Sequence, residues 1–262
     1  MTNTLKYLFA LLAAFTWLNA EAFVTAIGKG ASAVVRPLIK HPQTLPDADI
    51  AHLAQLGSKP GGTKEIGSFL GSKNLPDAVI EDTYLRIAVQ QSTIPEAEAA
   101  GMMTRLRGTP GFRSTLSKTV GASDIKTSGH LNELRIADKA AENGFTVRGI
   151  GSPFNDPNKA AATDIDVLLE RNGKIIAIEA KDYAPDTLIP MDKFRADMVS
   201  LNEYAKANRS SRVLQVFSMT NKSTSDELRR LLSMEAERRG VELIYGSPDE
   251  VIIQVKQLVD LL

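Results

Sequence analysis

The sequence predicts an α/β fold that is preceded by a mostly helical N-terminal region. Residues 126–262 alternate between apolar runs of strand length and longer segments with helical periodicity, which is typical of an α/β domain. Residues 23–125 instead contain short helical stretches that are separated by prolines and glycines. With 262 residues, the chain is long enough for two modest domains.

Residues 1–22 have the pattern of a secretory signal peptide. A short segment with one positive charge precedes the mostly apolar run 7–18, and small residues at Ala20 and Ala22 offer a cleavage site. Because this run is shorter than the roughly 20 apolar residues that span a bilayer, we expect no membrane span after cleavage. The protein is therefore expected to be secreted or periplasmic, and the absence of cysteine is compatible with export. A retained interfacial anchor, or a cytoplasmic protein with an apolar N-terminus, is the alternative.

The region 23–125 is interpreted as a small helical domain or a loose N-terminal arm, joined to the rest of the chain through residues 121–128. Its breaks include Lys59-Pro-Gly-Gly62 and Gly108-Thr-Pro-Gly111. The sequence does not indicate what this region does. Four helical stretches are expected in it, at residues 47–56, 64–70, 77–91 and 95–106.

A further helix is expected at residues 129–144. Its apolar positions recur at helical spacing, and Gly144 is a natural C-terminal stop. The first strand is then expected at residues 145–150. The apolar stripe of this helix consists of Leu134, Ala137, Ala140 and Ala141.

Two apolar strands flank Asn172-Gly173, a dipeptide that is a strong signal for a β-hairpin. The first strand carries Asp166, and the second ends in Glu179-Ala180-Lys181. Because side chains alternate along a strand, Glu179 and Lys181 are expected on one side of the sheet. The folded hairpin is therefore expected to bring two carboxylates and one ammonium group into a single corner.

The remaining segments complete an α/β pattern. The helix expected at 225–239 has a plausible cap at Ser223 or Ser225 and a stop at Gly240. In order, the expected elements are a helix at 191–208, a strand at 213–219, the helix at 225–239, a strand at 241–245, and a last helix that begins at Pro248.

The corner that contains Asp166 and Glu179 suits a hard divalent cation. Mg²⁺ prefers a few carboxylate oxygens and shares its other positions with water and phosphate, and the main-chain carbonyl of Ala180 is a third expected ligand. A bound metal ion activates water and offsets charge on a phosphate. Lys181 is then expected to orient the attacking water or to stabilise the charge that develops on phosphorus.

At this point the chain resembles the PD-(D/E)XK nuclease superfamily, and most closely its Holliday-junction-resolvase-like branch. The resemblance rests on Asp166, the hairpin, and Glu179-Ala-Lys181, and it covers roughly residues 126–220. It implies a restriction-endonuclease-like fold, with a mixed central sheet flanked by helices and an αβββαβ core. One departure from the family pattern is that Ile165, not proline, precedes Asp166.

The resemblance also implies an inward-facing glutamate on the helix before the strands. Glu133 fits this role as a fourth catalytic and metal-binding residue, although Asp138 and Glu142 are alternatives on the same helix. Asp164 competes with Asp166, because alternation places both on one face of the same strand; the spacing to the E-x-K motif favours Asp166.

The structural alternative for Glu179 and Lys181 is an exposed ion pair at a sheet edge, which would contribute little. The apolar run 175–178 argues against it, because such a run is typical of a buried central strand. A carboxylate at the end of a buried strand is costly unless it is paired. Weaker candidates for contact with a substrate are His130, Asp182, Tyr183 and Gln215.

Together these features predict a Mg²⁺-dependent endonuclease, with Mn²⁺ as a substitute, that cuts nucleic acid and most readily DNA. The equal numbers of acidic and basic residues, 31 each, provide no overall basic surface, so phosphate binding would depend on a local patch and on the metal. The alternatives are a structure-selective junction resolvase and a catalytically inactive binding module. By weak analogy of architecture, the chain resembles secreted toxins or effectors, for which an immunity protein is the expected partner; a homodimer is also expected of resolvase-like proteins.

Overall fold

The structure is a computed structural model, and within it residues 37–262 form one compact unit. The predicted signal peptide, residues 1–22, lies outside the described residues. The structure describes residues 36–120, 124–157, 159, 162–184, 187–209, 212–221 and 225–261.

The helical N-terminal region that the sequence predicts is present. The four expected helices form within a few residues of their expected ends, but the short helix α6 was not predicted. Its eight residues contain only two large apolar side chains, Phe112 and Leu116, which is too little for a periodic signal. The helices are α2 (Asp47–Gly57), α3 (Gly62–Ser72), α4 (Asp77–Gln90), α5 (Glu96–Leu106) and α6 (Phe112–Thr119).

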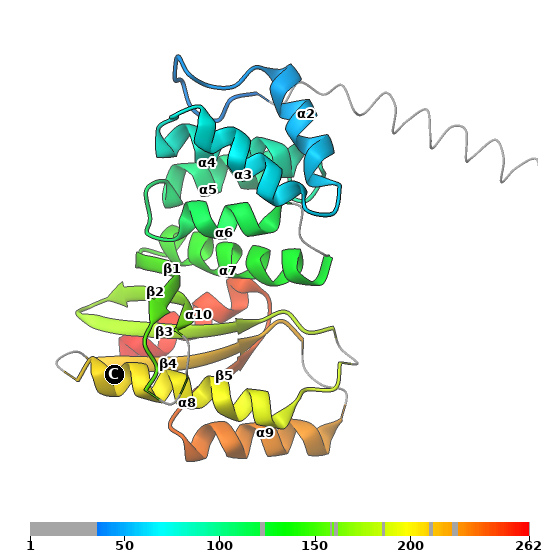
Figure 1. The fold of residues 1–262 in the computed structure, drawn as a ribbon. Helices are drawn as coiled ribbons and strands as arrows, with labels where there is room; N and C mark the ends of the chain where they lie inside the picture. Colours follow the sequence, from blue (N-terminus) through cyan, green and yellow to red (C-terminus); the bar gives the residue numbers. More distant parts are fainter. Residues whose placement is uncertain are drawn as a thin grey trace, which may run out of the picture. The chain divides into compact units, whose positions relative to one another are not determined.

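Helix α7 (Asp124–Glu142) lies between this region and the sheet (Figure 1). Its first residues, 124–128, were expected to belong to a linker; they are helical. The C-terminal stop at Gly144 is confirmed. Gly144 adopts φ +81°, and the amide of Phe145 donates to the carbonyl of Ala140 at 3.0 Å, which is the bonding pattern of a Schellman motif.

The sheet is mixed and has five strands in the order β1-β2-β3-β4-β5. Strand β2 is antiparallel to both of its neighbours, β1 and β3, whereas β3, β4 and β5 are parallel. Strand β3 is therefore central, as its apolar sequence predicts. The strands are β1 (Thr146–Phe154), β2 (Thr163–Arg171), β3 (Lys174–Lys181), β4 (Arg212–Met219) and β5 (Glu242–Tyr245).

The predicted hairpin connects β2 to β3. Asn172 and Gly173 both adopt positive φ, +53° and +72°, as a type I′ turn requires. Only glycine and, less readily, asparagine or aspartate adopt this conformation at low cost, so the dipeptide fixes the register of the two strands. This register places Val167 opposite Ile178.

Three more helices complete the fold in the expected order. Of the two caps that the sequence suggests for α9, Ser225 is confirmed, because its hydroxyl accepts from the amide of Leu228 at 3.2 Å. The helices are α8 (Met191–Ala207), α9 (Asp226–Arg238) and α10 (Pro248–Leu261).

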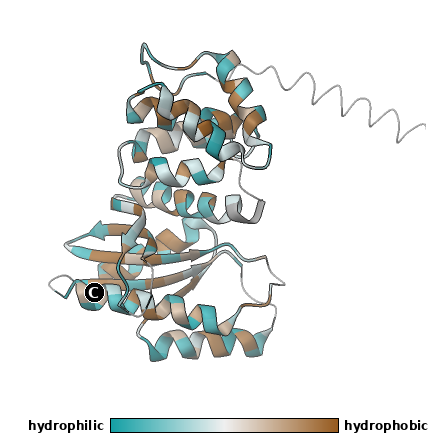
Figure 2. Cartoon of the chain, viewed as in Figure 1, coloured by the Kyte–Doolittle hydropathy of each residue, from teal (hydrophilic) through white to brown (hydrophobic). Residues whose placement is uncertain are grey.

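Each face of the sheet buries its own apolar cluster. Helices α7 and α10 cover one face, and α8 and α9 cover the other (Figure 1). Strand β3 supplies both clusters: Ile176 and Ile178 face α7, whereas Ala177 faces α8. The strands between the two layers are accordingly mostly hydrophobic in Figure 2.

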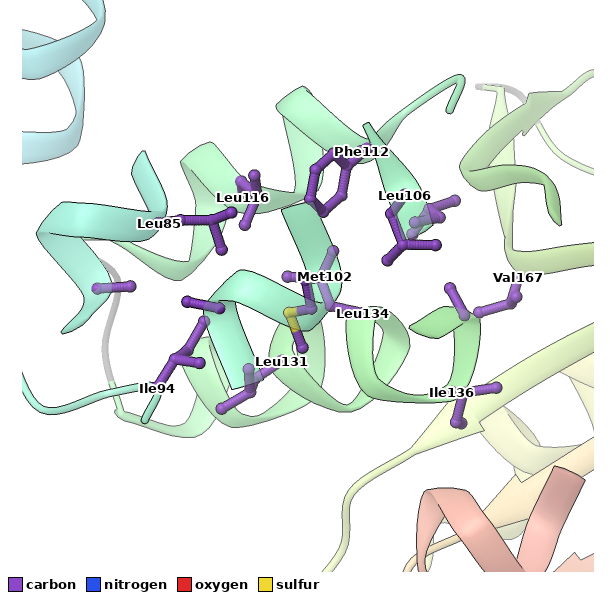
Figure 3. Packing of buried hydrophobic residues seen from close by; sticks show 14 of the residues in the cluster. Leu85, Ile94, Met102, Leu106, Phe112, Leu116, Leu131, Leu134, Ile136 and Val167 are labelled. Atoms are coloured by element: carbon purple, nitrogen blue, oxygen red, sulfur yellow. The ribbon is translucent and has the colours of Figure 1, made fainter. Parts of the chain in front are cut away.

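The helical region shares its core with the sheet. Figure 3 shows Met102 and Phe112 packed near Leu134 of α7, while Ile136 and Val167 continue the same cluster toward the strands. Residues 37–120 are thus packed onto α7 by continuous apolar contacts, as part of the same compact unit. Among the described residues, no helix is both long and apolar enough to cross a membrane.

A buried ion network stabilises the helical region. Arg86 of α4 is fully buried, and its guanidinium donates to the carbonyl of Leu45 at 2.6 Å and to the Asp47 carboxylate at 2.5 Å. It also lies 3.9 Å from Asp82, which accepts hydrogen bonds from the amides of residues 38 and 39. The network therefore ties the segment before α2 to α4.

We expect Arg86→Met to lower the free energy of unfolding by about 3–5 kcal/mol, because it leaves the buried Asp82 without its cation. Urea denaturation followed by circular dichroism measures this loss. The matched control is Arg113→Met, since Arg113 and its partner Asp77 form an exposed pair; this variant should change stability by less than about 1 kcal/mol. If the two variants lose the same free energy of unfolding, the buried Arg86 network contributes no more to stability than an exposed ion pair does.

Candidate functional site

The candidate site lies where β2 and β3 separate. Their paired register ends at Val167 and Ile178, and beyond this point the Asp166 carboxylate takes the place of a strand neighbour. Oδ2 of Asp166 accepts a hydrogen bond from the main-chain amide of Ala180 at 2.7 Å. The regular main-chain pairing of β2 with β3 therefore ends next to the residues that carry the charged groups.

Lys181 is the centre of this charged cluster. Its ammonium group pairs with Oε1 of Glu179 and lies 3.7 Å from Oδ2 of Asp166. Asp166 and Glu179 are only 8% and 7% exposed. The structure therefore brings together Asp166, Glu179 and Lys181, the three side chains that the sequence singled out, in one buried corner.

Glu133 reaches the same corner from α7. Glu133 is 8% exposed, and its Oε1 lies 3.0 Å from Nδ1 of His130. The charge of Glu133 helps to raise the pKa of Asp166. Of the acids on α7, Glu133 is therefore the one whose charge acts on Asp166. The two alternatives on this helix, Asp138 and Glu142, form ion pairs elsewhere, with Arg105 and Lys139.

Asp164 does not join the cluster. Its side chain is exposed, and its carboxylate lies beside Gly151 of β1. Asp166, one alternation further along β2, is the aspartate that contacts both Ala180 and Lys181. The preference for Asp166, which the sequence suggested only through spacing, agrees with this geometry.

The main-chain carbonyl of Ala180 points toward the same space. In a strand, the N–H and C=O of one residue face the same neighbouring strand. The Ala180 amide faces β2, where it donates to Asp166, whereas the Glu179 carbonyl faces β4 and accepts from Ser218 at 3.3 Å. The Ala180 carbonyl is therefore directed to the side of Asp166.

The cluster holds more negative than positive charge. Burial, and then the charge of Glu179, raises the pKa of Asp166. Burial also raises the pKa of Glu179, and the nearby Lys181 offsets only part of this effect. Burial alone would lower the pKa of Lys181, but the carboxylates of Glu179, Asp166 and Asp197 outweigh it and raise that pKa. The ammonium group is thus firmly charged, while the carboxylates lack sufficient cationic partners.

Helix α8 adds Lys193, one of the cations of the C-terminal part that the sequence offers for phosphate contact, and Asp197, which the sequence reasoning missed. Asp197 is 7% exposed; its Oδ2 lies 3.7 Å from the ammonium nitrogen of Lys181 and 3.0 Å from that of Lys193. The available signal was a Lys–Asp pair four residues apart on the helix that follows the E-x-K strand. Such pairs usually indicate a solvated helix surface, so the signal was weak.

The other candidates border the site. Asp182 accepts a hydrogen bond from the Ser128 hydroxyl of α7. Tyr183 packs against the apolar cluster on the α8 side, and burial raises the pKa of its phenol. Gln215 of β4 lies opposite Ala177 of β3, which precedes Glu179 by two residues. The buried Oε1 of Gln215 has no hydrogen-bond partner among the described residues.

The donor set suits Mg²⁺ although it is small. Among the described residues, no three His, Asp or Glu side chains are gathered closely enough to hold a metal ion. Mg²⁺ does not require such a cage, because it is commonly held by one or two carboxylates and completes its shell with water and phosphate. Asp166, Glu179 and the Ala180 carbonyl form a set of this kind, and the excess negative charge of the corner favours a divalent cation.

Comparison with known proteins provides no family assignment. The chain matches no protein-family model, and it has no significant match among curated proteins.

We expect Asp166→Asn to raise the stability of the metal-free protein at neutral pH. Folding raises the pKa of Asp166, so its ionised form opposes folding, whereas asparagine is neutral and still accepts from the Ala180 amide. The wild type regains stability as the pH falls through the raised folded pKa toward the unfolded value of about 3.9. The difference between the two proteins should therefore shrink at acid pH.

Thermal unfolding in chelator, between neutral pH and about pH 4, measures this difference. Asp164→Asn is the matched control, because it makes the same substitution at an exposed position of the same strand. A loss of stability in Asp166→Asn at neutral pH would show instead that the charged carboxylate supports the fold.

Proposed function

We propose that this protein is a Mg²⁺-dependent endonuclease with a restriction-endonuclease-like fold, and that it hydrolyses phosphodiester bonds of nucleic acid, most readily of DNA. The observation that carries the proposal is the convergence of Asp166, Glu179 and Lys181 at the point where β2 and β3 diverge. The element order α7-β1-β2-β3-α8-β4 and the mixed sheet agree with the αβββαβ core that the resemblance implies.

Each residue of the cluster has a role that follows from its chemistry. Asp166, Glu179 and the Ala180 carbonyl would hold the ion, and Glu133 adds negative charge from α7. The chemistry that the ion supplies when bound is activation of a water nucleophile and neutralisation of phosphate charge. Lys181 is a fixed positive charge beside these oxygens, so it stabilises the negative charge that develops on the phosphate and orients the water.

The charged groups of the site hold one another in position. The buried carboxylates hold the Lys181 ammonium group in place, and the hydrogen bond from the Ala180 amide fixes the Asp166 carboxylate. A preorganised charge does not have to reorient during the reaction, which is the main source of its catalytic effect. Export through residues 1–22, and an action as a toxin or effector, remain part of this proposal as extensions.

Supercoiled plasmid DNA, incubated with the purified protein and Mg²⁺ or Mn²⁺, tests the activity. We expect nicking or linearisation that a chelator abolishes. Glu179→Gln and Lys181→Met should each lose at least about 100-fold in rate while they remain folded, since each removes a charge that acts at the transition state. Lys206→Met is the control, because Lys206 pairs with Glu203 at the exposed C-terminal end of α8.

Two outcomes of the plasmid assay would contradict the proposal. If the folded wild type leaves both DNA and RNA intact with either metal at high protein concentration, the hydrolytic proposal is wrong and a binding module is favoured. If either Glu179→Gln or Lys181→Met cuts at the wild-type rate, the roles assigned to these residues are wrong.

Metal binding is measurable without catalysis. We expect Mg²⁺ to raise the thermal midpoint of the wild type, by an amount equivalent to about 2.7 kcal/mol at 100 times the dissociation constant. The shift should be much smaller for Glu179→Gln, which lacks one of the two carboxylate ligands. Equal shifts in both proteins would place the Mg²⁺ site elsewhere in the chain.

A further inference from the structure

Asp197 connects the cluster to a second lysine at its edge. One carboxylate oxygen, Oδ2, lies within 3.7 Å of both the Lys181 and the Lys193 ammonium nitrogens. Lys181 is largely buried, with 17% of its side chain exposed, whereas 56% of the Lys193 side chain is exposed. A single buried carboxylate therefore joins an interior cation to one that faces solvent.

This arrangement differs from an ordinary helix ion pair. Lys206 and Glu203 on the same helix are both near its C-terminal end, and the lysine is 59% exposed, much like Lys193. The partner of Lys206 makes no ion pair with a strand among the described residues, whereas Asp197 also faces Lys181 of β3. A buried carboxylate that is shared by cations of β3 and α8 can fix the position of both, which an exposed pair on one helix cannot do.

The charge balance indicates what Lys193 can bind. The Lys181 ammonium group lies within 3.7 Å of three carboxylates, those of Asp166, Glu179 and Asp197, and Glu133 adds further negative charge near Asp166. An approaching phosphate therefore meets repulsion unless a cation stands at the entrance. The chain has no net positive charge that would supply attraction from a distance. Lys193 is an exposed cation that lies against this corner through Asp197.

We propose that Lys193 binds a backbone phosphate of the substrate at the entrance of the site, and that Asp197 is a positioning residue that holds Lys193 and Lys181 on either side of one carboxylate. The proposal rests on the function proposed above, because it assigns a substrate phosphate to that same site. It separates the two lysines by role: Lys193 acts in substrate binding, and Lys181 acts on the reacting phosphate.

Two measurements separate these roles. In the first, a fluorescently labelled DNA duplex is titrated with Glu179→Gln protein in chelator, so that cleavage is suppressed, over a range of salt concentrations. Adding Lys193→Met should weaken binding about three- to tenfold and reduce the slope of log K against log salt by about one, since one phosphate contact is lost. Lys193→Arg should retain the wild-type slope.

In the second, cleavage rates are measured with Mg²⁺ over a range of DNA concentrations. Lys193→Met should raise KM and change kcat by less than about threefold, because it removes binding that is equal in the ground and transition states. Asp197→Asn should raise KM and also lower kcat at least tenfold, because it removes one of the three carboxylates that hold the Lys181 ammonium group in position. Asp197→Glu, which keeps the charge, should recover part of kcat; the unfolding midpoint of each variant checks that it is folded.

Lys206→Met is the matched control for both measurements, since it removes an equally exposed lysine from the far end of the same helix. If Lys193→Met binds and cuts DNA as Lys206→Met does, the role of Lys193 is wrong, although wild-type cleavage and its loss in Lys181→Met would still support the endonuclease. If folded Asp197→Asn keeps the wild-type kcat, its positioning role is wrong. If the wild type neither cuts nor binds DNA or RNA, the proposed function itself fails, and this inference fails with it.

Discussion

The contact on which the site depends is that of the Lys181 ammonium group with the carboxylates of Glu179, Asp166 and Asp197. Each of these acids is buried, so each would be costly as an isolated charge. One cation cannot neutralise all of them, and burial together with mutual repulsion raises the pKa of Asp166 and Glu179. Apolar residues of similar volume would fold at lower cost, and this argues that the charges are retained for chemistry.

The helical region is part of the same physical argument, because it supports the helix that carries Glu133. Two ion pairs fasten α5 to the part of α7 that follows Glu133: Arg135 with Glu98 at 2.7 Å, and Arg105 with Asp138 at 2.6 Å. The continuous apolar cluster also joins α7 to the strands. Residues 37–120 therefore support the position of α7 against the sheet.

The sequence predicted the features that depend on local chemistry. Asn172-Gly173 determines a turn, and alternation then places Glu179 and Lys181 on one side of β3, so neither step requires knowledge of distant residues. Asp197 illustrates the limit. Its position is set by how α8 packs across the sheet, and from sequence it is only one member of a helical Lys–Asp pair. Helix α6 and the shared core were likewise not predicted, since both arise from long-range packing of residues such as Phe112.

The proposed endonuclease has no net charge, which is unusual for a protein that binds nucleic acid. Long-range attraction requires many cations, but a phosphate that has reached the site interacts chiefly with charges within a Debye length, about 8–10 Å at moderate salt. Within that range, the orientation of a few groups matters more than the total. Three charged groups follow one another from the solvent toward the carboxylates of β2 and β3. They are the exposed Lys193, the buried Asp197, and Lys181 in the interior. An overall neutral surface then disfavours indiscriminate electrostatic binding and leaves affinity to be decided at the site.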